Sequence, residues 1–311
     1  MVPADPPGGM TDLARRSRWG LRIAAMPPVS FFVVSAVFHY LGPAFAVLLF
    51  VHVSVLGVAW LRIASAAVVF ALWRRPWRLV RHLSPRQRWI LVALGVVLAA
   101  MNSLFYLAID RIPLSTVGAI EFLGTVILAA VGTRTRRNLV ALLLAVAGVA
   151  ALTDLRIVDE PIGFVFAFAN CAGFMAYVVL GHRIANTEVG GASEAGPMTG
   201  IDQLGAAMII AAVVATPLGL GGATTTFVHP LWLLWGVAVG VCSSVIPYVT
   251  DQLAMARLRR ATFALMLAVL PATATAIGLV VLHQVPTLQD LVGIGLVIAG
   301  LVLHQERASS P

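Results

Sequence analysis

Long apolar runs, separated by short segments rich in arginine, proline or glycine, make up most of this sequence. An α-helix of about 20 mostly apolar residues is long enough to cross the roughly 30 Å hydrocarbon core of a membrane. Dividing the chain at charges and turns gives ten candidate spans, at residues 28–50, 55–73, 89–109, 114–133, 138–153, 161–182, 201–219, 230–250, 261–283 and 288–305. The sequence therefore predicts an all-α membrane protein with ten transmembrane helices.

The composition excludes an ordinary soluble domain. Of the 311 residues, 60% are hydrophobic and 11% are charged, whereas soluble domains average about 45–50% apolar and 25% charged residues. The net charge is +8, and all 21 basic residues are arginines, because the chain has no lysine. Since most of these arginines lie between the apolar runs, we interpret them as a topology signal and expect no nucleic-acid partner.

The arginines divide unequally between the two sides of the expected membrane. If the N-terminus is cytoplasmic, 18 of the 21 arginines fall on the cytoplasmic side, while Arg111 and Arg156 fall outside and Arg62 lies within a span. Cytoplasmic loops carry the excess of positive charge in membrane proteins. We therefore predict a multi-pass protein of a bacterial-type inner membrane, surrounded by lipid, with both termini in the cytoplasm.

The two halves of the chain resemble each other. A Leu-Ala-x-x-Arg-x-x-x-x-Thr motif occurs at 107–116 and again at 253–262, and an Ala-Gly pair recurs in the fifth and tenth spans. Five helices per repeat would force the second copy to insert upside down, an arrangement known from secondary transporters. We expect two inverted five-helix repeats, at residues 28–155 and 156–305. A disordered cytoplasmic tail at 1–27 would precede them, and a cytoplasmic tail at 306–311 would follow.

Glu121 is the clearest functional candidate. It lies about two turns into the fourth span, and an ionisable side chain inside a membrane costs at least about 2.5–3.5 kcal/mol. A carboxyl group at this depth could exchange protons or pair with a cationic group of a solute. The alternative is a protonated glutamate that hydrogen-bonds a neighbouring helix.

Three further spans carry polar or aromatic residues at helical spacing. They are Asn102 with Tyr106, Asn170 with Tyr177, and Ser244 with Tyr248 and Asp251. Such faces indicate either a cavity wall or hydrogen bonds between helices. Asp251 is a second candidate for proton coupling, although it could instead pair with the arginines at 257–260. For Arg62 we expect a carboxylate or helix-end carbonyl partner rather than a solute.

Motifs of enzymes and ATP-driven pumps are missing from the sequence. It has no H-E-x-x-H, G-x-S-x-G, P-loop or G-x-G-x-x-G pattern, each of which supplies a specific chemistry. Its two cysteines, Cys171 and Cys242, lie within apolar runs without metal-ligand spacing. We therefore expect neither an enzyme nor a cofactor or metal site, and transport would have to be secondary.

Four stretches resemble the signature regions of EamA-type permeases of the drug/metabolite transporter superfamily, most closely the threonine/homoserine exporter branch: 56–66, 101–124, 170–185 and 246–266. The resemblance implies ten helices in two inverted repeats and a central cavity lined largely by helices 1, 3, 4, 6, 8 and 9. It also implies export of amino acids or related metabolites in exchange for protons. Asn102, Tyr106, Glu121, Tyr177, Tyr248 and Asp251 fall where that branch carries polar groups.

This chain departs from the branch at three places. Leu270 precedes Pro271 where the branch has glutamate, Gly124-Thr125 replaces Gly-Pro, and His283-Gln284 replaces Gly-Glu. The chain thus has fewer carboxylates in its helices. Two alternatives stay open: a permease for other metabolites or cationic drugs, and a non-transporting membrane partner or flippase subunit. Small residues at 293–300 allow close helix contact, either between the halves or between protomers of a homodimer.

Overall fold

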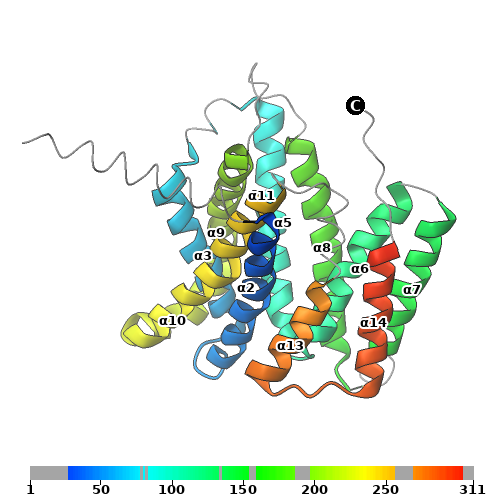
Figure 1. Ribbon diagram of the computed structural model, residues 1–311. Coiled ribbons are helices and arrows are strands. Elements are labelled where there is room, and N and C mark those ends of the chain that lie inside the picture. Colours follow the sequence, from blue (N-terminus) through cyan, green and yellow to red (C-terminus); the bar gives the residue numbers. More distant parts are fainter. Residues whose placement is uncertain are drawn as a thin grey trace, which may run out of the picture.

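The computed structural model describes residues 27–77, 80, 83–132, 135–153, 159–185, 197–255 and 269–303. Within these ranges the chain forms ten helices, which Figure 1 shows as a helical bundle. They are α2 (Pro28–Leu49), α3 (Val55–Arg74), α5 (Pro85–Ile109), α6 (Leu114–Gly132), α7 (Arg136–Thr153), α8 (Pro161–Ala185), α9 (Pro197–Val228), the continuous unit α10 (Pro230–Gly240), η1 (Val241–Val245) and α11 (Ile246–Met255), then α13 (Leu270–Leu282) and α14 (Leu288–Leu303). The prediction of an all-α chain with one helix per apolar run is confirmed.

In the part of the chain that the structure describes, six helices are long and apolar enough to cross a membrane: α2, α3, α5, α8, α9 and the α10–α11 unit. Shorter apolar helices occur in α6, α13 and α14. The beginning of the predicted ninth span, 261–268, lies outside the described residues. Lipid is the only solvent in which so many long apolar helices can expose their side chains, so this is a multi-pass membrane protein.

One predicted boundary is wrong. The seventh span was expected at 201–219, where Pro217 and the glycines close behind it suggest a turn, but α9 continues as a helix to Val228. The glycines serve close packing instead of a turn. A Cβ atom on Gly219 would lie 2.3 Å from Cβ of Trp60 in α3, so no larger residue fits between these two helices.

The antiparallel packing of α3 against α9 is held by specific contacts along its length. The indole Nε1 of Trp60 donates a hydrogen bond of 2.9 Å to Thr216 Oγ1. At the other end of the pair, the guanidinium of Arg74 binds both carboxylate oxygens of Asp202, at 2.7 and 3.0 Å. Such a two-pronged contact fixes the relative position of two helices more strictly than a single ion pair does.

Helices α7 and α14 pack together through small residues. A Cβ atom on Gly148 would lie 2.5 Å from the Gly293 carbonyl oxygen, and one on Gly300 would lie 2.6 Å from the Ala141 carbonyl oxygen. The small residues at 293–300 therefore serve a contact within this chain. Figure 1 shows these two helices side by side at one edge of the bundle.

Helix α13 ends in a strained conformation at His283. This residue has φ of 54°, a left-handed backbone that glycine adopts more easily than any residue with a Cβ atom. The next residue, Gln284, closes the helix end by donating its N–H to the Gly278 carbonyl at 3.0 Å. By the resemblance described above, histidine stands where the exporter pattern would place glycine, the residue that this backbone favours.

Replacing His283 with glycine should therefore stabilise the protein. We expect the free energy of unfolding to rise by about 0.5–1 kcal/mol, because relief of the left-handed strain exceeds the entropy that glycine adds to the unfolded chain. Thermal unfolding of detergent-solubilised protein measures the effect. His283→Ala is the control, since it removes the imidazole but keeps Cβ. Equal midpoints for the two variants would contradict the strain argument.

Candidate functional site

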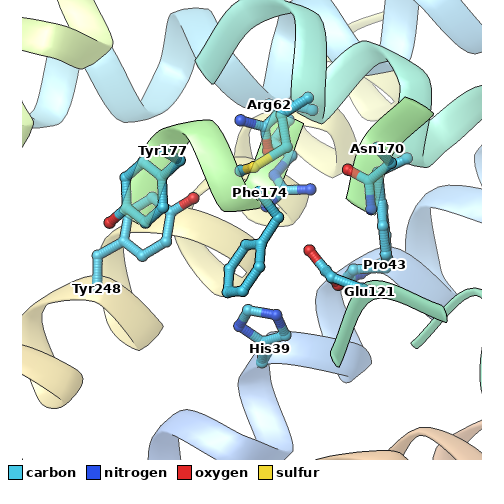
Figure 2. Close-up of a pocket in the computed structure, with 11 residues that line it drawn as sticks. His39, Pro43, Arg62, Glu121, Asn170, Phe174, Tyr177 and Tyr248 are labelled. Atoms are coloured by element: carbon cyan, nitrogen blue, oxygen red, sulfur yellow. The ribbon is translucent and has the colours of Figure 1, made fainter. Parts of the chain in front are cut away.

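A small cavity lies inside the bundle, where polar side chains meet. Its volume is about 40 Å³, and eleven residues line it: His39, Pro43, Arg62, Met101, Asn102, Phe105, Glu121, Asn170, Phe174, Tyr177 and Tyr248. They come from α2, α3, α5, α6, α8 and α11. Figure 2 shows Arg62, Glu121, Asn170 and His39 around the central space, with Tyr177 and Tyr248 together at one side.

The set of lining helices differs in part from the one that the family resemblance implied. Five of the six implied helices contribute, namely α2, α5, α6, α8 and α11. The described part of the ninth helix, α13, supplies no lining residue, and the second helix, α3, contributes instead through Arg62. This replacement brings a cation into the cavity wall.

Glu121 and Asn170 have buried polar atoms with incomplete hydrogen bonding. Glu121 is 5% exposed and Asn170 is fully buried. Among the described residues, Glu121 Oε2 and both amide atoms of Asn170 lack a hydrogen bond of ordinary geometry, although the two side chains lie close enough to interact with each other. Figure 2 shows the two side chains beside the same open space. A buried polar group with incomplete hydrogen bonding costs about 1–3 kcal/mol, so a ligand that bonds both side chains would be stabilised here.

Arg62 is held in the cavity wall by the unit formed by η1 and α11. Its Nε donates to Ser244 Oγ at 3.0 Å, and its Nη2 donates to the Ser243 carbonyl oxygen at 3.2 Å. The residue four positions later is Pro247, which has no N–H, so this carbonyl receives no α-helical hydrogen bond from it. On the other side, the guanidinium carbon lies 5.2 Å from the ring centre of Tyr106. The expected carbonyl partner of Arg62 is present, but it lies within the helical unit and not at a helix end.

Arg62 and Glu121 are opposite charges that are not paired with each other. Among the described residues, no carboxylate lies within 4.0 Å of the Arg62 guanidinium, whereas Arg74 pairs with Asp202 and Arg111 with Asp110. Arg62 is 5% exposed, like Glu121. A buried charge needs a partner of opposite sign to offset its loss of hydration. The cavity therefore offers one site for an anionic group and one for a cationic group.

The other predicted site residues fall into two groups. Asn102, Tyr177 and Tyr248 line the cavity with Glu121 and Asn170. Tyr106 and Asp251 do not: Tyr106 is fully buried behind Arg62, and Asp251 lies about one turn after Tyr248 in the middle of α11. The arginines at 257–260, which could pair with Asp251, lie outside the described residues. The side-chain Nδ2 of Asn102 also donates a hydrogen bond to the Leu98 carbonyl of its own helix.

Sequence reasoning missed the apolar part of the wall. Phe174 lies between Asn170 and Tyr177 on one face of α8 and packs against the Tyr177 ring, with 6.1 Å between ring centres. A signal was available, because positions i, i+4 and i+7 share a helix face. Aromatic residues are so common in apolar runs, however, that the spacing alone does not separate a cavity wall from a packing contact.

The two departures that concern carboxylates have clear structural places. Leu270, at the start of α13, is buried in the hydrophobic core. Gln284 Oε1 accepts a hydrogen bond of 3.1 Å from the backbone N–H of Leu114, the first residue of α6. Gln284 therefore satisfies one of the N–H groups that a helix start leaves free, and it joins the end of α13 to the helix that carries Glu121.

Many apolar helices, with a buried cavity that presents both charges, define a multi-pass membrane protein of the transporter class. The chain is 31% identical over 262 residues to the threonine/homoserine exporter RhtA of Escherichia coli K12, covering 83% of this chain and 84% of that protein. The corresponding protein of Salmonella typhimurium LT2 is 30% identical over the same length. The chain belongs to this exporter family, within the EamA-type permeases of the drug/metabolite transporter superfamily.

Two other comparisons add to this one. No protein-family model matches the chain. A solved crystal structure matches the fold with a TM-score of 0.58 at 17% identity, covering 88% of this chain and 96% of the other. At this identity the match supports the helical architecture alone.

Proposed function

We propose that this protein exports small amino acids of the threonine and homoserine type across a bacterial inner membrane, in exchange for protons. The observation that carries the proposal is the buried pair of Glu121 and Asn170, which line the cavity and, apart from their interaction with each other, leave polar atoms without a hydrogen bond of ordinary geometry. A solute ammonium group is a donor and a cation, so it matches a carboxylate and an amide oxygen. Between solutes, Glu121 would carry the exchanged proton, with Asp251 as a second acidic group nearer the helix end.

The charges of the cavity wall favour an amino acid over a cationic drug. Its volume of about 40 Å³ is far below the roughly 300–1,000 Å³ of pockets that hold drug-sized ligands, and it must widen even for an amino acid. Arg62 and Glu121 together match a solute that carries both charges, whereas Arg62 would repel a cationic drug. This pair of charges supports amino-acid transport over the alternative of a permease for cationic drugs.

Alternating access by two inverted repeats, 28–155 and 156–305, is the mechanism we infer. The packing supports it: α5 lies against α8, as α11 lies against α2, while α3 pairs with α9 and α7 with α14. A two-fold axis between the halves would convert the α5–α8 contact into the α2–α11 contact. It would convert the α3–α9 and α7–α14 contacts into themselves. Gly148 and Gly300, the repeated glycines, each contact the opposite helix by close backbone approach. The two halves would rock about the cavity, with both termini on the cytoplasmic side.

Efflux from proteoliposomes tests the proposal. We expect vesicles that contain the purified protein to release labelled L-threonine and L-homoserine faster than empty vesicles, and faster still when a proton gradient opposes the solute gradient in direction. A panel of other amino acids and the cation ethidium measures selectivity. Release of ethidium without threonine would favour the drug permease, and no flux of any solute under any gradient would favour a non-transporting membrane partner.

A further inference from the structure

Arg62 has the position of a ligand-binding residue. It lines the same cavity as Glu121 but comes from another helix, α3. Figure 2 shows its guanidinium across the open space from the Glu121 carboxylate. Two of its five N–H groups are used: Nε donates to the Ser244 hydroxyl and Nη2 donates to the Ser243 carbonyl. These two hydrogen bonds and the Tyr106 ring fix the plane of the guanidinium, while the end formed by Nη1 and Nη2 keeps donors for a ligand.

The charge of Arg62 indicates which ligand group it binds. Among the described residues no carboxylate lies within 4.0 Å of it, although it is nearly fully buried. The hydrogen-bond acceptors that hold it, a hydroxyl and a carbonyl, are neutral. Neutral acceptors compensate a buried cation only in part. An anionic group of the solute would complete the compensation, and a guanidinium binds a carboxylate through two parallel hydrogen bonds.

We propose that Arg62 binds the carboxylate of the solute while Glu121 binds its ammonium group, so that the cavity recognises an α-amino acid as a zwitterion. This inference rests on the amino-acid transport proposed above and adds the residue that determines specificity. A zwitterion pairs both buried charges at once, whereas a simple amine leaves Arg62 unpaired and an organic acid leaves Glu121 unpaired. The site selects a zwitterion because only a solute with both charges compensates the buried charges of Arg62 and Glu121.

The π-helical turn η1 is what positions Arg62. Pro247 withholds an N–H from the Ser243 carbonyl, which frees that oxygen for Arg62. On the other side of the turn, a Cβ atom on Gly240 would lie 2.7 Å from the Arg62 carbonyl oxygen, so α3 and the turn are in close backbone contact. Any rocking of the α10–α11 unit relative to α3 would therefore move the carboxylate site.

Competition against labelled L-threonine tests this assignment, with unlabelled L-threonine and L-threoninamide as the two probes. The amide keeps the ammonium group and the shape but lacks the negative charge. For wild-type protein in proteoliposomes we expect threonine to compete at least about tenfold better than threoninamide, since a hydrogen bond to a charged group contributes that much or more. In Arg62→Gln the two should compete equally, and the affinity for threonine should fall about tenfold.

Arg74→Gln is the matched control. Arg74 lies on the same helix and also contacts an aromatic ring, that of Trp73, but it pairs with Asp202 away from the cavity. The threonine to threoninamide ratio should stay at its wild-type value in this variant. A wild-type ratio near one, or an unchanged ratio in Arg62→Gln, would overturn the assignment while leaving amino-acid transport intact.

A second variant covers the case in which Arg62→Gln does not fold. Ser244→Ala removes the hydroxyl that accepts from Arg62 Nε and keeps the charge, so it should lower the ratio only partly. An unchanged ratio in Ser244→Ala, combined with a Glu121-dependent flux, would again overturn the role of Arg62. Absence of any amino-acid flux in wild-type protein would instead contradict the proposed function itself.

Discussion

Glu121→Gln is expected to reduce threonine efflux by about a hundredfold or more, because removing one partner of a buried charge pair costs about 2–5 kcal/mol. Glutamine has nearly the same shape, so the cavity wall stays intact. It can still accept a hydrogen bond from an ammonium group, but it cannot neutralise it or carry a proton. The loss should appear in affinity for the solute and also in the response to a proton gradient.

The experiment compares initial efflux rates at equal reconstituted protein, with and without a pH difference across the vesicle membrane. Glu160→Gln is the matched control, since Glu160 is an exposed carboxylate just before α8; its removal should leave both the rate and the pH response unchanged. Thermal midpoints of all three proteins should agree closely, which separates transport from folding. Undiminished and still pH-dependent efflux by Glu121→Gln would exclude the role proposed for this residue.

The sequence predicts the helices well because the period and length of apolar runs are local properties. The ten runs predicted the ten helices of the described residues, and the prediction failed at the end of α9 because that end is decided by a distant contact. A glycine in a turn and a glycine in a helix contact look alike in sequence, and only the Trp60 side chain of α3, about 160 residues away, decides that Gly219 lies in a contact. Such contacts between distant segments are not contained in a local pattern.

The site shows the same division between local and distant causes. Glu121, Asn170 and Tyr177 could be found because polar groups are costly inside a membrane and stand out there. The place of Arg62 could not, since it depends on a carbonyl that Pro247 frees in a helix far along the chain. Tyr106 was expected beside the solute but lies behind Arg62. Helical spacing fixes the face of a helix, whereas the neighbouring helix decides what that face meets.

The close contact between α3 and α9 leads to the largest expected effect on stability. A Cβ atom on Gly57 would lie 2.5 Å from the carbonyl carbon of Gly222 and 2.6 Å from its oxygen. These are backbone atoms, which cannot rotate away as the end of a side chain can. Gly57→Ala must therefore push two helices apart. We expect the free energy of unfolding to fall by about 2 kcal/mol or more, because overpacking costs about 1–3 kcal/mol even where side chains can adjust.

Gly221→Ala is the matched control and should shift stability in the opposite direction. It changes the residue next to Gly222, where a Cβ atom would meet nothing within 4 Å. Alanine is a better helix former than glycine by roughly 0.5–1 kcal/mol, so this variant should be slightly stabilised. Thermal unfolding in detergent, followed by tryptophan fluorescence, gives both midpoints. A Gly57→Ala midpoint at or above that of wild type would mean that α3 and α9 do not approach at backbone distance. The arrangement of α3 that brings Arg62 to the cavity would then lose its support, because the same helix carries both residues.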